Sequence, residues 1–233
     1  MGELRVALLG CGAVGSQVFR LLGEQAGDLA ARVGAPLQVA GVAVRDPAGR
    51  ARAAGVPDEL ITTDAMGLVT RSDVDIVVEM IGGIEPARSL LLAAMRTGKS
   101  VVTANKALLG ADGAVMHAAA REHGADLFYE AAVAGAIPLL RPLRESLAGD
   151  AVRRVLGIVN GTTNYILDKM DSSGAEFAEA LKEAQDLGYA EADPTADVGG
   201  SDAAHATSVD ALRAMDVVRA VASVMRVEGE GEE

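Results

Sequence analysis

The sequence predicts an α/β fold, a doubly wound parallel sheet followed by an incomplete α+β domain. Through residue 133, short apolar runs alternate with amphipathic stretches, which is typical of parallel strands joined by helices. A glycine-rich turn directly follows the first apolar run. Hydrophobic residues make up 50% of the chain and aromatic residues only 3%, so the core must be aliphatic, which suits a sheet covered by helices.

The first apolar run, residues 6–9, leads straight into the sequence GCGAVG at residues 10–15. This is a G-x-G-x-x-G pattern, and the amphipathic stretch behind it predicts a helix. Gly10 would make a tight turn, Gly12 would let the backbone approach a pyrophosphate, and Gly15 would let the helix lie close to the strand. A glycine-rich turn without a ligand is the alternative. The strand before the turn and the helix after it favour a dinucleotide site.

A second strand is predicted over residues 37–44, after a short helix over residues 25–34. It ends at Arg45 and Asp46, where a Rossmann unit contacts the adenosine ribose. An acidic residue there prefers a free 2′-hydroxyl, whereas an arginine accepts a 2′-phosphate. Because Arg45 comes first, we expect NADP rather than NAD, and a solvated charge at a strand end is the alternative for Arg45.

The rest of the first domain repeats the alternation of strands and helices, after a region of short turns over residues 47–74. Such sheets bind ligands at the carboxyl ends of their strands, where Arg45 and Lys106 fall. The predicted strands cover residues 75–81, 100–103 and 126–133, and the predicted helices cover residues 85–98, with Pro86 in the first turn, and 107–123.

Beyond Gly135 a second domain is predicted, with a polar turn at residues 160–164. The predicted domains are an NAD(P)-binding Rossmann domain (1–134), a second domain (135–227) and a disordered acidic tail (228–233). The second domain would contain a strand over residues 152–159 and helices over 137–147, from 165 to 170 and over 208–227. A further helix would end at Gly188, with a capping box at Ser173 and Glu176. Its apolar face would consist of Phe177, Leu181, Ala184 and Leu187.

Composition excludes several classes of protein. A net charge of −12 argues against nucleic acid and anionic membrane as partners. The single cysteine excludes an internal disulfide and fits a reducing cytoplasm, and three histidines with one cysteine form no transition-metal pattern. The early core strand leaves no room for a signal peptide, and no apolar stretch is long enough to span a bilayer. A small-molecule substrate is the expected partner.

Five motifs follow one another along the chain: GCGAVG at residues 10–15, VVTANK at 101–106, EAAVAGAIP at 130–138, GIVNGTTNY at 157–165 and GYAEADP at 188–194. Together, over roughly residues 4–205, they resemble homoserine dehydrogenase. The resemblance implies NAD(P)-dependent interconversion of L-homoserine and L-aspartate 4-semialdehyde, a step toward threonine and methionine. It also implies that residues 135–227 are a partial substrate and dimerisation domain, and a homodimer is compatible with it.

The resemblance also assigns residues by matching position. Lys106 is the lysine expected to act in catalysis, because the hydroxyl proton of the substrate must be moved. The cofactor would be held by Gly10, Gly12, Ala13, Val14, Gly15, Arg45, Lys106 and Gly188. The substrate would be contacted by Thr162 in the polar turn and by Tyr189, Glu191, Asp197 and Asp202 in an acidic loop. The alternative for this loop is a set of carboxylates that face water.

A monovalent cation such as Na+ is implied at Glu130, with main-chain oxygens of Val133, Gly135 and Ile137. A carboxylate and carbonyl oxygens suit a hard ion. The alternative for Glu130 is a strand-end carboxylate paired with an arginine. Ala136 replaces the second glycine usual in the family, so an altered bend is expected here.

The chain departs from the family in two ways. Ala206 stands where the family has a lysine, four residues after Asp202, and His205 would point about 100° away on a helix. The family also continues well beyond this point, and a frameshift, a truncated gene or a fragment would explain both departures. We therefore expect NADP(H) binding with poor or no turnover. The alternatives are a non-catalytic NADP-binding or interaction protein and, less well supported, another oxidoreductase of the aspartate dehydrogenase type.

Overall fold

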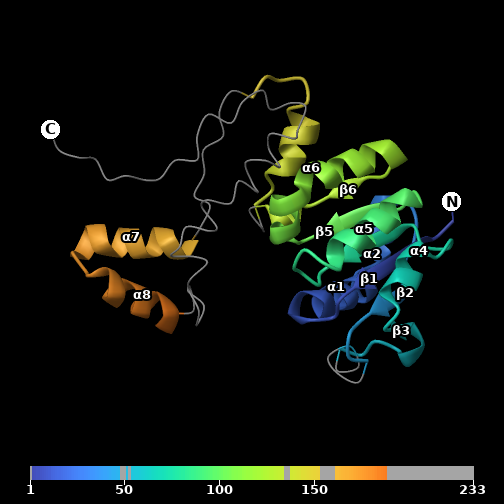
Figure 1. The fold of residues 1–233 in the computed structure, drawn as a ribbon, viewed down its shortest axis with the longest axis horizontal. Helices are drawn as coiled ribbons and strands as arrows, with labels where there is room; N and C mark the ends of the chain where they lie inside the picture. Colours follow the sequence, from blue (N-terminus) through green and yellow to red (C-terminus); the bar gives the residue numbers. More distant parts are fainter. Residues whose placement is uncertain (1, 48–50, 52–53, 134–136, 153–160, 188–233) are drawn as a thin grey trace. The chain divides into compact units, whose positions relative to one another are not determined.

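A computed structural model of the chain describes residues 2–47, 51, 54–133, 137–152 and 161–187. The chain divides into two compact units, Met1–Arg141 and Pro142–Glu233 (Figure 1).

The first unit is built on a parallel sheet with six strands in the order β3-β2-β1-β4-β5-β6. At its carboxyl edge, Leu9 of β1 lies between Ala43 of β2 and Glu79 of β4. The order reverses between β1 and β4, as in a doubly wound sheet, so the predicted fold class is confirmed. The strands are β1 (Leu4–Leu9), β2 (Leu37–Ala43), β3 (Ile61–Thr62), β4 (Ile76–Glu79), β5 (Ser100–Thr103) and β6 (Leu127–Phe128).

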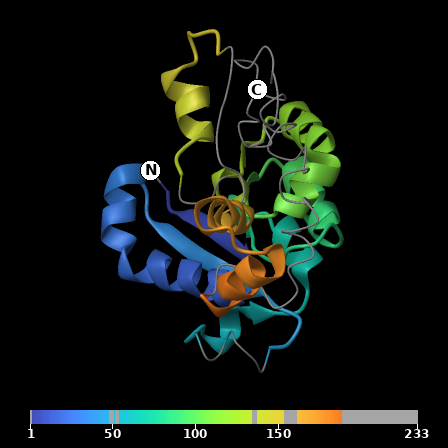
Figure 2. The same ribbon diagram turned by 90° about the vertical axis from the view of Figure 1, so that its left-hand side faces the viewer.

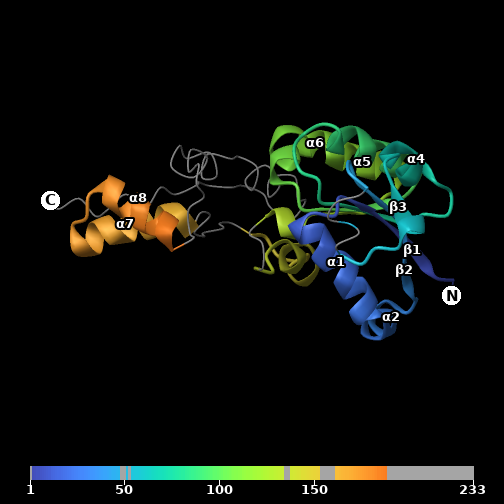
Figure 3. The same cartoon turned by 90° about the horizontal axis from the view of Figure 1, so that it is seen from below.

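Helices cover both faces of this sheet. Helices α1 and α2 lie on one face, and α4, α5 and α6 lie on the other (Figures 2 and 3). The core between these layers is aliphatic, as predicted, and Tyr129 is the one aromatic side chain fully buried among the residues described. The helices are α1 (Ala13–Glu24), α2 (Ala26–Val33), α4 (Ala65–Thr70), α5 (Ala87–Arg96) and α6 (Lys106–His123).

The region 47–74 contains more regular structure than expected. A 3-10 turn, η1 (Asp58–Leu60), leads into β3, which pairs with β2, and α4 follows. Asp64 caps α4, since its Oδ1 accepts a hydrogen bond from the backbone N–H of Gly67 at 2.7 Å. The prediction of turns alone was wrong because elements this short show no hydrophobic period.

Three predicted boundaries were also wrong. The strand predicted over 126–133 ends at Phe128, because its one neighbour, β5, offers partners only for Leu127 and Phe128. The chain then forms a 3-10 turn, η2 (Glu130–Ala132), and becomes helical again only at residue 140, continuing as the π-helix η3 (Pro142–Ser146). Pro86 is the N-cap of α5 rather than a residue of its first turn.

The second unit contains two helices, α7 (Gly161–Ser173) and α8 (Phe177–Asp186), which pack on each other. Ile166 of α7 is buried with Ala180 and Ala184 of α8, and Leu181 packs beside them. The small alanines let the helices approach closely. Of the predicted apolar face of α8, Leu181 and Ala184 pack against α7, whereas Phe177 and Leu187 are 44% and 56% exposed.

Two local predictions in this unit fail. Residues 161–164, predicted as a polar turn, form the start of α7. The predicted capping box is absent from α8, because the Ser173 hydroxyl donates instead to the carbonyl of Lys169 at 2.6 Å, and Glu176 is the N-cap without a side-chain hydrogen bond. The predicted helix over 208–227, the tail and residues 153–159 of the predicted strand lie outside the residues described. No helix in the described ranges has the length and apolar character to cross a bilayer.

A charged contact joins α7 to α8. Glu183 Oε1 accepts hydrogen bonds from Lys169 Nζ at 2.9 Å and from the Tyr165 hydroxyl at 2.8 Å. These donors hold the pKa of Glu183 below its ordinary value, Lys169 contributing most, and Glu183 raises the pKa of Lys169. The stabilisation from Glu183 is therefore present above its unfolded-state pKa and is lost as the pH falls through its lower folded-state pKa.

We expect Glu183→Gln to lower the midpoint of urea unfolding at pH 7. At about pH 2, well below the ordinary glutamate pKa of about 4.3, the midpoints of the variant and the unmodified chain should be equal. Helix content followed by circular dichroism measures both midpoints. Glu122→Gln, at an exposed site on α6, is the matched control. Equal midpoints at pH 7 for Glu183→Gln and the unmodified chain would contradict the role of this contact.

Candidate functional site

The glycine turn between β1 and α1 has the geometry that its sequence predicts. Gly10 has a φ of +96°, a backbone conformation that favours glycine. A Cβ on Gly15 would lie 2.3 Å from the carbonyl oxygen of Gly10, so the first turn of α1 can pack here only without a side chain. A Cβ on Gly12 would meet nothing within 4 Å. The close contact of helix and turn therefore depends on Gly15, while Gly12 borders open space.

The N-terminus of α1 suits an anionic group. Its N-cap is Gly12, which has no side chain to accept a hydrogen bond, and no acidic residue lies in the first turn. Ala13 and Val14, the next two residues, are exposed. The first N–H groups of a helix have no acceptor within it and lie at the positive end of its dipole, so a phosphate can bind there.

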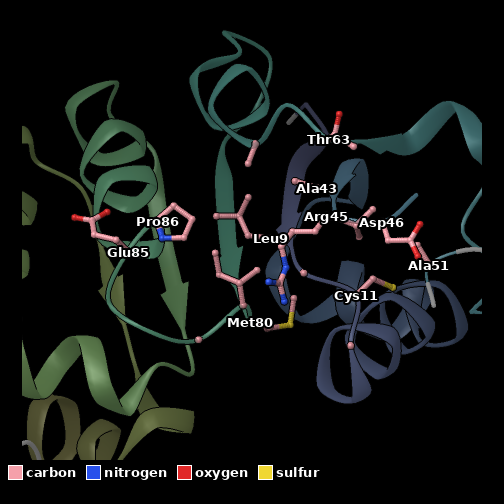
Figure 4. Close-up of a pocket in the computed structure, with 16 residues that line it drawn as sticks. Leu9, Cys11, Ala43, Arg45, Asp46, Ala51, Thr63, Met80, Glu85 and Pro86 are labelled. Carbon is pink, nitrogen blue, oxygen red and sulfur yellow. The ribbon is translucent and has the colours of Figure 1, made fainter. Parts of the chain in front are cut away.

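A cavity of about 880 Å³ opens beside this turn, at the carboxyl ends of β1, β2 and β4. Its walls are the glycine turn with Cys11, the end of β2 with Arg45, and the segment from Met80 to Pro86 (Figure 4). The cavity lies where the strand order reverses, and its volume is within the range of about 300–1,000 Å³ usual for ligand sites.

Arg45 supplies a positive charge at one end of the cavity. Its guanidinium extends into the cavity, and the carboxylate of Asp46 lies to one side of it (Figure 4). Arg45 is exposed, and no carboxylate of the described residues forms an ion pair with it. Thr63, which follows β3, also lines this region. An unpaired guanidinium can receive a phosphate in a bidentate contact.

Lys106 is the first residue of α6 and is exposed, but it does not line the cavity. Asn105 fixes the start of this helix, since its Oδ1 accepts from the N–H of Leu108 at 3.0 Å. Its Nδ2 donates to the carbonyl of Gly83 at 2.6 Å, which ties α6 to the segment that forms the third wall. Lys106 is thus placed at the strand end next to that wall.

The carboxylate of Glu130 is engaged by backbone N–H groups. Oε1 accepts from Leu139 at 2.7 Å and from Leu140 at 2.9 Å, and Oε2 accepts from Arg141 at 2.9 Å. A carboxylate has about four acceptor positions, so about one remains. Among the predicted cation ligands, Val133 is buried, Ile137 is 59% exposed, and Gly135 lies outside the described residues. In the part of the chain that the structure describes, no three acidic, histidine or cysteine side chains cluster as a metal site.

The predicted substrate residues fall mainly beyond the structure's described ranges. Thr162 is buried in the first turn of α7. The positions that lie outside are Tyr189, Glu191, Asp197 and Asp202, together with Gly188, His205 and Ala206.

Several cavity residues were not predicted from the sequence. Thr63 was missed because β3 was not recognised as a strand, so no strand end was expected there. The wall from Met80 to Pro86 follows β4, and the paired glycines Gly82 and Gly83 are the signal that could have identified it. Cys11 is buried, and burial raises the pKa of its thiol, so it lines the cavity as an uncharged group at neutral pH.

The arrangement can bind an extended anionic ligand. The start of α1 offers backbone donors for a diphosphate, and Arg45 offers a cation for a further phosphate. The segment after β4, which Asn105 ties to α6, lines the same cavity. These features match the parts of a dinucleotide that carries a phosphate on its ribose.

Two family models match nearly all of this chain. The model described as homoserine dehydrogenase, NAD binding domain, matches residues 10–130, and the model described as homoserine dehydrogenase matches residues 138–229.

Individual relatives agree. The chain is 58% identical over 204 residues to a homoserine dehydrogenase of Corynebacterium glutamicum, in an alignment that covers 88% of this chain and 45% of the relative. It is 60% identical over 199 residues to one of Mycobacterium tuberculosis, which covers 85% and 44%. The chain therefore spans slightly less than half the length of these curated relatives.

Solved structures are similar as well. A homoserine dehydrogenase of Thiobacillus denitrificans has a TM-score of 0.78 at 46% identity, covering 87% of this chain and 47% of that one. A hyperthermophilic archaeal homoserine dehydrogenase in complex with NADPH has a TM-score of 0.73 at 27% identity, covering 90% and 69%.

The two glycines of the turn predict opposite outcomes. Gly12→Ala should keep the fold, because its Cβ meets nothing within 4 Å, but should weaken dinucleotide binding by placing a methyl group where the ligand approaches. Gly15→Ala should lower the stability by more than about 2 kcal/mol, because its Cβ collides with the backbone at Gly10. Thermal unfolding and dinucleotide titration measure both effects. A stable Gly15→Ala variant, or a Gly12→Ala variant with unchanged affinity, would contradict this division of roles.

Proposed function

The chain belongs to the homoserine dehydrogenase family, and on that premise we propose that it binds NADP(H) and serves the interconversion of L-homoserine and L-aspartate 4-semialdehyde. The observation that carries the proposal is the cavity beside the glycine turn, with an uncapped helix N-terminus on one wall and Arg45 on another. We assign cofactor binding to residues 1–134 and substrate binding to residues 135–227.

The cofactor residues that we propose divide into three groups by chemistry. The backbone at the turn and the start of α1 holds the diphosphate, and Arg45 holds the ribose phosphate. Lys106 contacts the cofactor or substrate from the start of α6. The residues are Gly10, Gly12, Ala13, Val14, Gly15, Arg45, Lys106 and, outside the described ranges, Gly188.

A nicotinamide held in this site would supply the hydride chemistry at the carbinol carbon of the substrate. The protein must also move the hydroxyl proton and hold both charged ends of the substrate. Lys106 is our candidate for the proton, because an ammonium group can donate to the carbonyl oxygen as it becomes a hydroxyl. Carboxylates suit the substrate ammonium group. We propose Thr162, Tyr189, Glu191, Asp197 and Asp202 as the substrate contacts, on the resemblance of their motifs to the family.

A monovalent cation such as Na+ is proposed at Glu130, Val133, Gly135 and Ile137, with a change in the role of Glu130. Because three backbone N–H groups already engage its carboxylate, the side chain fits poorly as the main ligand. We propose that it folds the segment so that main-chain carbonyl oxygens hold the ion. Replacing sodium chloride by choline chloride at equal ionic strength should then lower the melting temperature, and an unchanged value would contradict the proposal.

A homodimer formed through the second unit and a cytoplasmic location complete the proposal. The single cysteine of the chain is compatible with a reducing compartment.

The activity assay follows the absorbance of reduced cofactor while the purified chain is incubated with homoserine and NADP. We expect NADPH binding with little turnover, because Ala206 stands where the family motif has a lysine. Ala206→Lys should raise the turnover. Full turnover by the unmodified chain would contradict the importance of position 206, and binding without any turnover in either chain would favour a non-catalytic NADP-binding protein.

The cofactor preference depends on Arg45. We expect Arg45→Ala to weaken NADPH binding roughly 10- to 100-fold, which is about 1.4–2.7 kcal/mol, and to leave NADH binding unchanged because NADH lacks the ribose phosphate. Fluorescence titration of both reduced cofactors measures this. Arg32→Ala, at an exposed position of α2, is the matched control. An equal loss for both cofactors would show that Arg45 does not read the phosphate.

A further inference from the structure

A buried carboxylate lies at the end of β4, next to the cavity. Glu79 is fully buried, and its neighbours Thr103 and Asn105 are 1% and 5% exposed. None of the lysine, arginine or histidine side chains described by the structure forms an ion pair with Glu79. Burying a carboxylate is strongly unfavourable unless hydrogen bonds replace its hydration, so the donors around Glu79 must compensate for this.

The first oxygen of Glu79 fixes the turn that follows β4. Its Oε1 accepts hydrogen bonds from the N–H groups of Ile81 at 2.8 Å and Gly82 at 2.9 Å. Both residues line the cavity, and Gly82 has a φ of +72°. Two consecutive N–H groups bound to one oxygen leave this turn little freedom, so Glu79 sets the backbone of one cavity wall.

The second oxygen connects the turn to α6. Oε2 accepts from the hydroxyl of Thr103, the last residue of β5, at 2.5 Å. The same hydroxyl oxygen accepts from the N–H of Asn105 at 3.0 Å. Asn105 caps α6 and donates back to Gly83 at 2.6 Å. The hydrogen bonds therefore form a closed circuit that joins the cavity wall to the start of the helix that carries Lys106.

The donors and acceptors give this circuit its direction. The Thr103 hydroxyl donates to Glu79, and its oxygen accepts from the N–H of Asn105. None of the four side-chain bonds of Glu79 and Thr103 supports the strand ladder: three go to turn or cap backbone, and the fourth joins the two side chains. A purely packing role would be served by an apolar side chain of similar size.

We propose that Glu79 is a positioning residue, which acts through Thr103 and Asn105 to hold the cavity wall and the first turn of α6 in the arrangement that receives the nicotinamide half of the cofactor. This inference rests on the proposed function. It assigns no contact between Glu79 and the cofactor, and it leaves the adenosine half to the glycine turn and Arg45.

Binding measurements with two probes test the inference. NADPH reaches both halves of the site, whereas adenosine 2′,5′-bisphosphate carries the ribose phosphate but no nicotinamide. In Thr103→Val we expect NADPH to bind at least about 10-fold more weakly, while the bisphosphate stays within about twofold of its original affinity. Thr103→Ser retains the hydroxyl and should bind NADPH as well as the unmodified chain does. Glu79→Gln, like Thr103→Val, should weaken the binding of NADPH much more than that of the bisphosphate.

The matched control is Thr97→Val. Thr97 is the C-cap of α5, and its hydroxyl is hydrogen-bonded to Ala93, Ala94 and Lys99. The substitution should change neither affinity. Equal NADPH affinity in Thr103→Val and the unmodified chain would overturn the proposal, and so would loss of both probes together, which would show a structural role only.

Hydrogen exchange of the ligand-free chain provides a readout that does not depend on the cofactor. The amides of Ile81, Gly82, Asn105 and Leu108 should exchange at least about 10-fold faster in Thr103→Val and Glu79→Gln, and at unchanged rates in Thr97→Val. Unchanged rates in both site variants would overturn the positioning role. If the unmodified chain does not bind NADPH, the proposed function fails, and the exchange rates still decide whether Glu79 holds these two segments.

Discussion

The parallel pairing of β1 with β4 is the constraint on which the rest of the first unit depends. It brings Leu9 and Glu79 side by side at the carboxyl edge, so that the glycine turn and the segment after β4 face each other across the cavity. Because β2 pairs with the other side of β1, Arg45 reaches the same edge. Strand pairing thus brings three loops that are far apart in the sequence together into one site.

Acidic and amide side chains organise these loops by accepting hydrogen bonds from the backbone. Asp64 and Asn105 cap α4 and α6, Glu79 holds the turn after β4, and Glu130 gathers the N–H groups of residues 139–141. The loops at the carboxyl edge cannot satisfy their N–H groups through the strand ladder, so side chains take that part. This explains why carboxylates occur at positions where the chemistry of the proposed reaction does not call for them.

The start of α1 works differently, because no side chain caps its first N–H groups. Gly12 provides no cap for α1, and Gly15 lets the helix press against Gly10 without a side chain between them. The same edge of the sheet therefore combines loops whose backbone groups are satisfied with one helix end that is left for a ligand. The similarity to homoserine dehydrogenases over both parts of the chain gives this contrast its functional meaning.

The sequence by itself determined the parallel sheet, the glycine turn and the position of Arg45, because strand and helix periods and the steric need for glycine are local properties. It failed for β3 and α4, which are too short to show a period, and for the end of β6, which is set by the extent of β5. It also could not show that Glu79 meets Thr103 across 24 residues, or that Glu130 binds the backbone of residues 139–141 rather than presenting a free carboxylate. Only the tertiary structure decided these, because a buried polar group takes its partners from whichever strand or loop packs beside it, and sequence spacing carries no record of that neighbour.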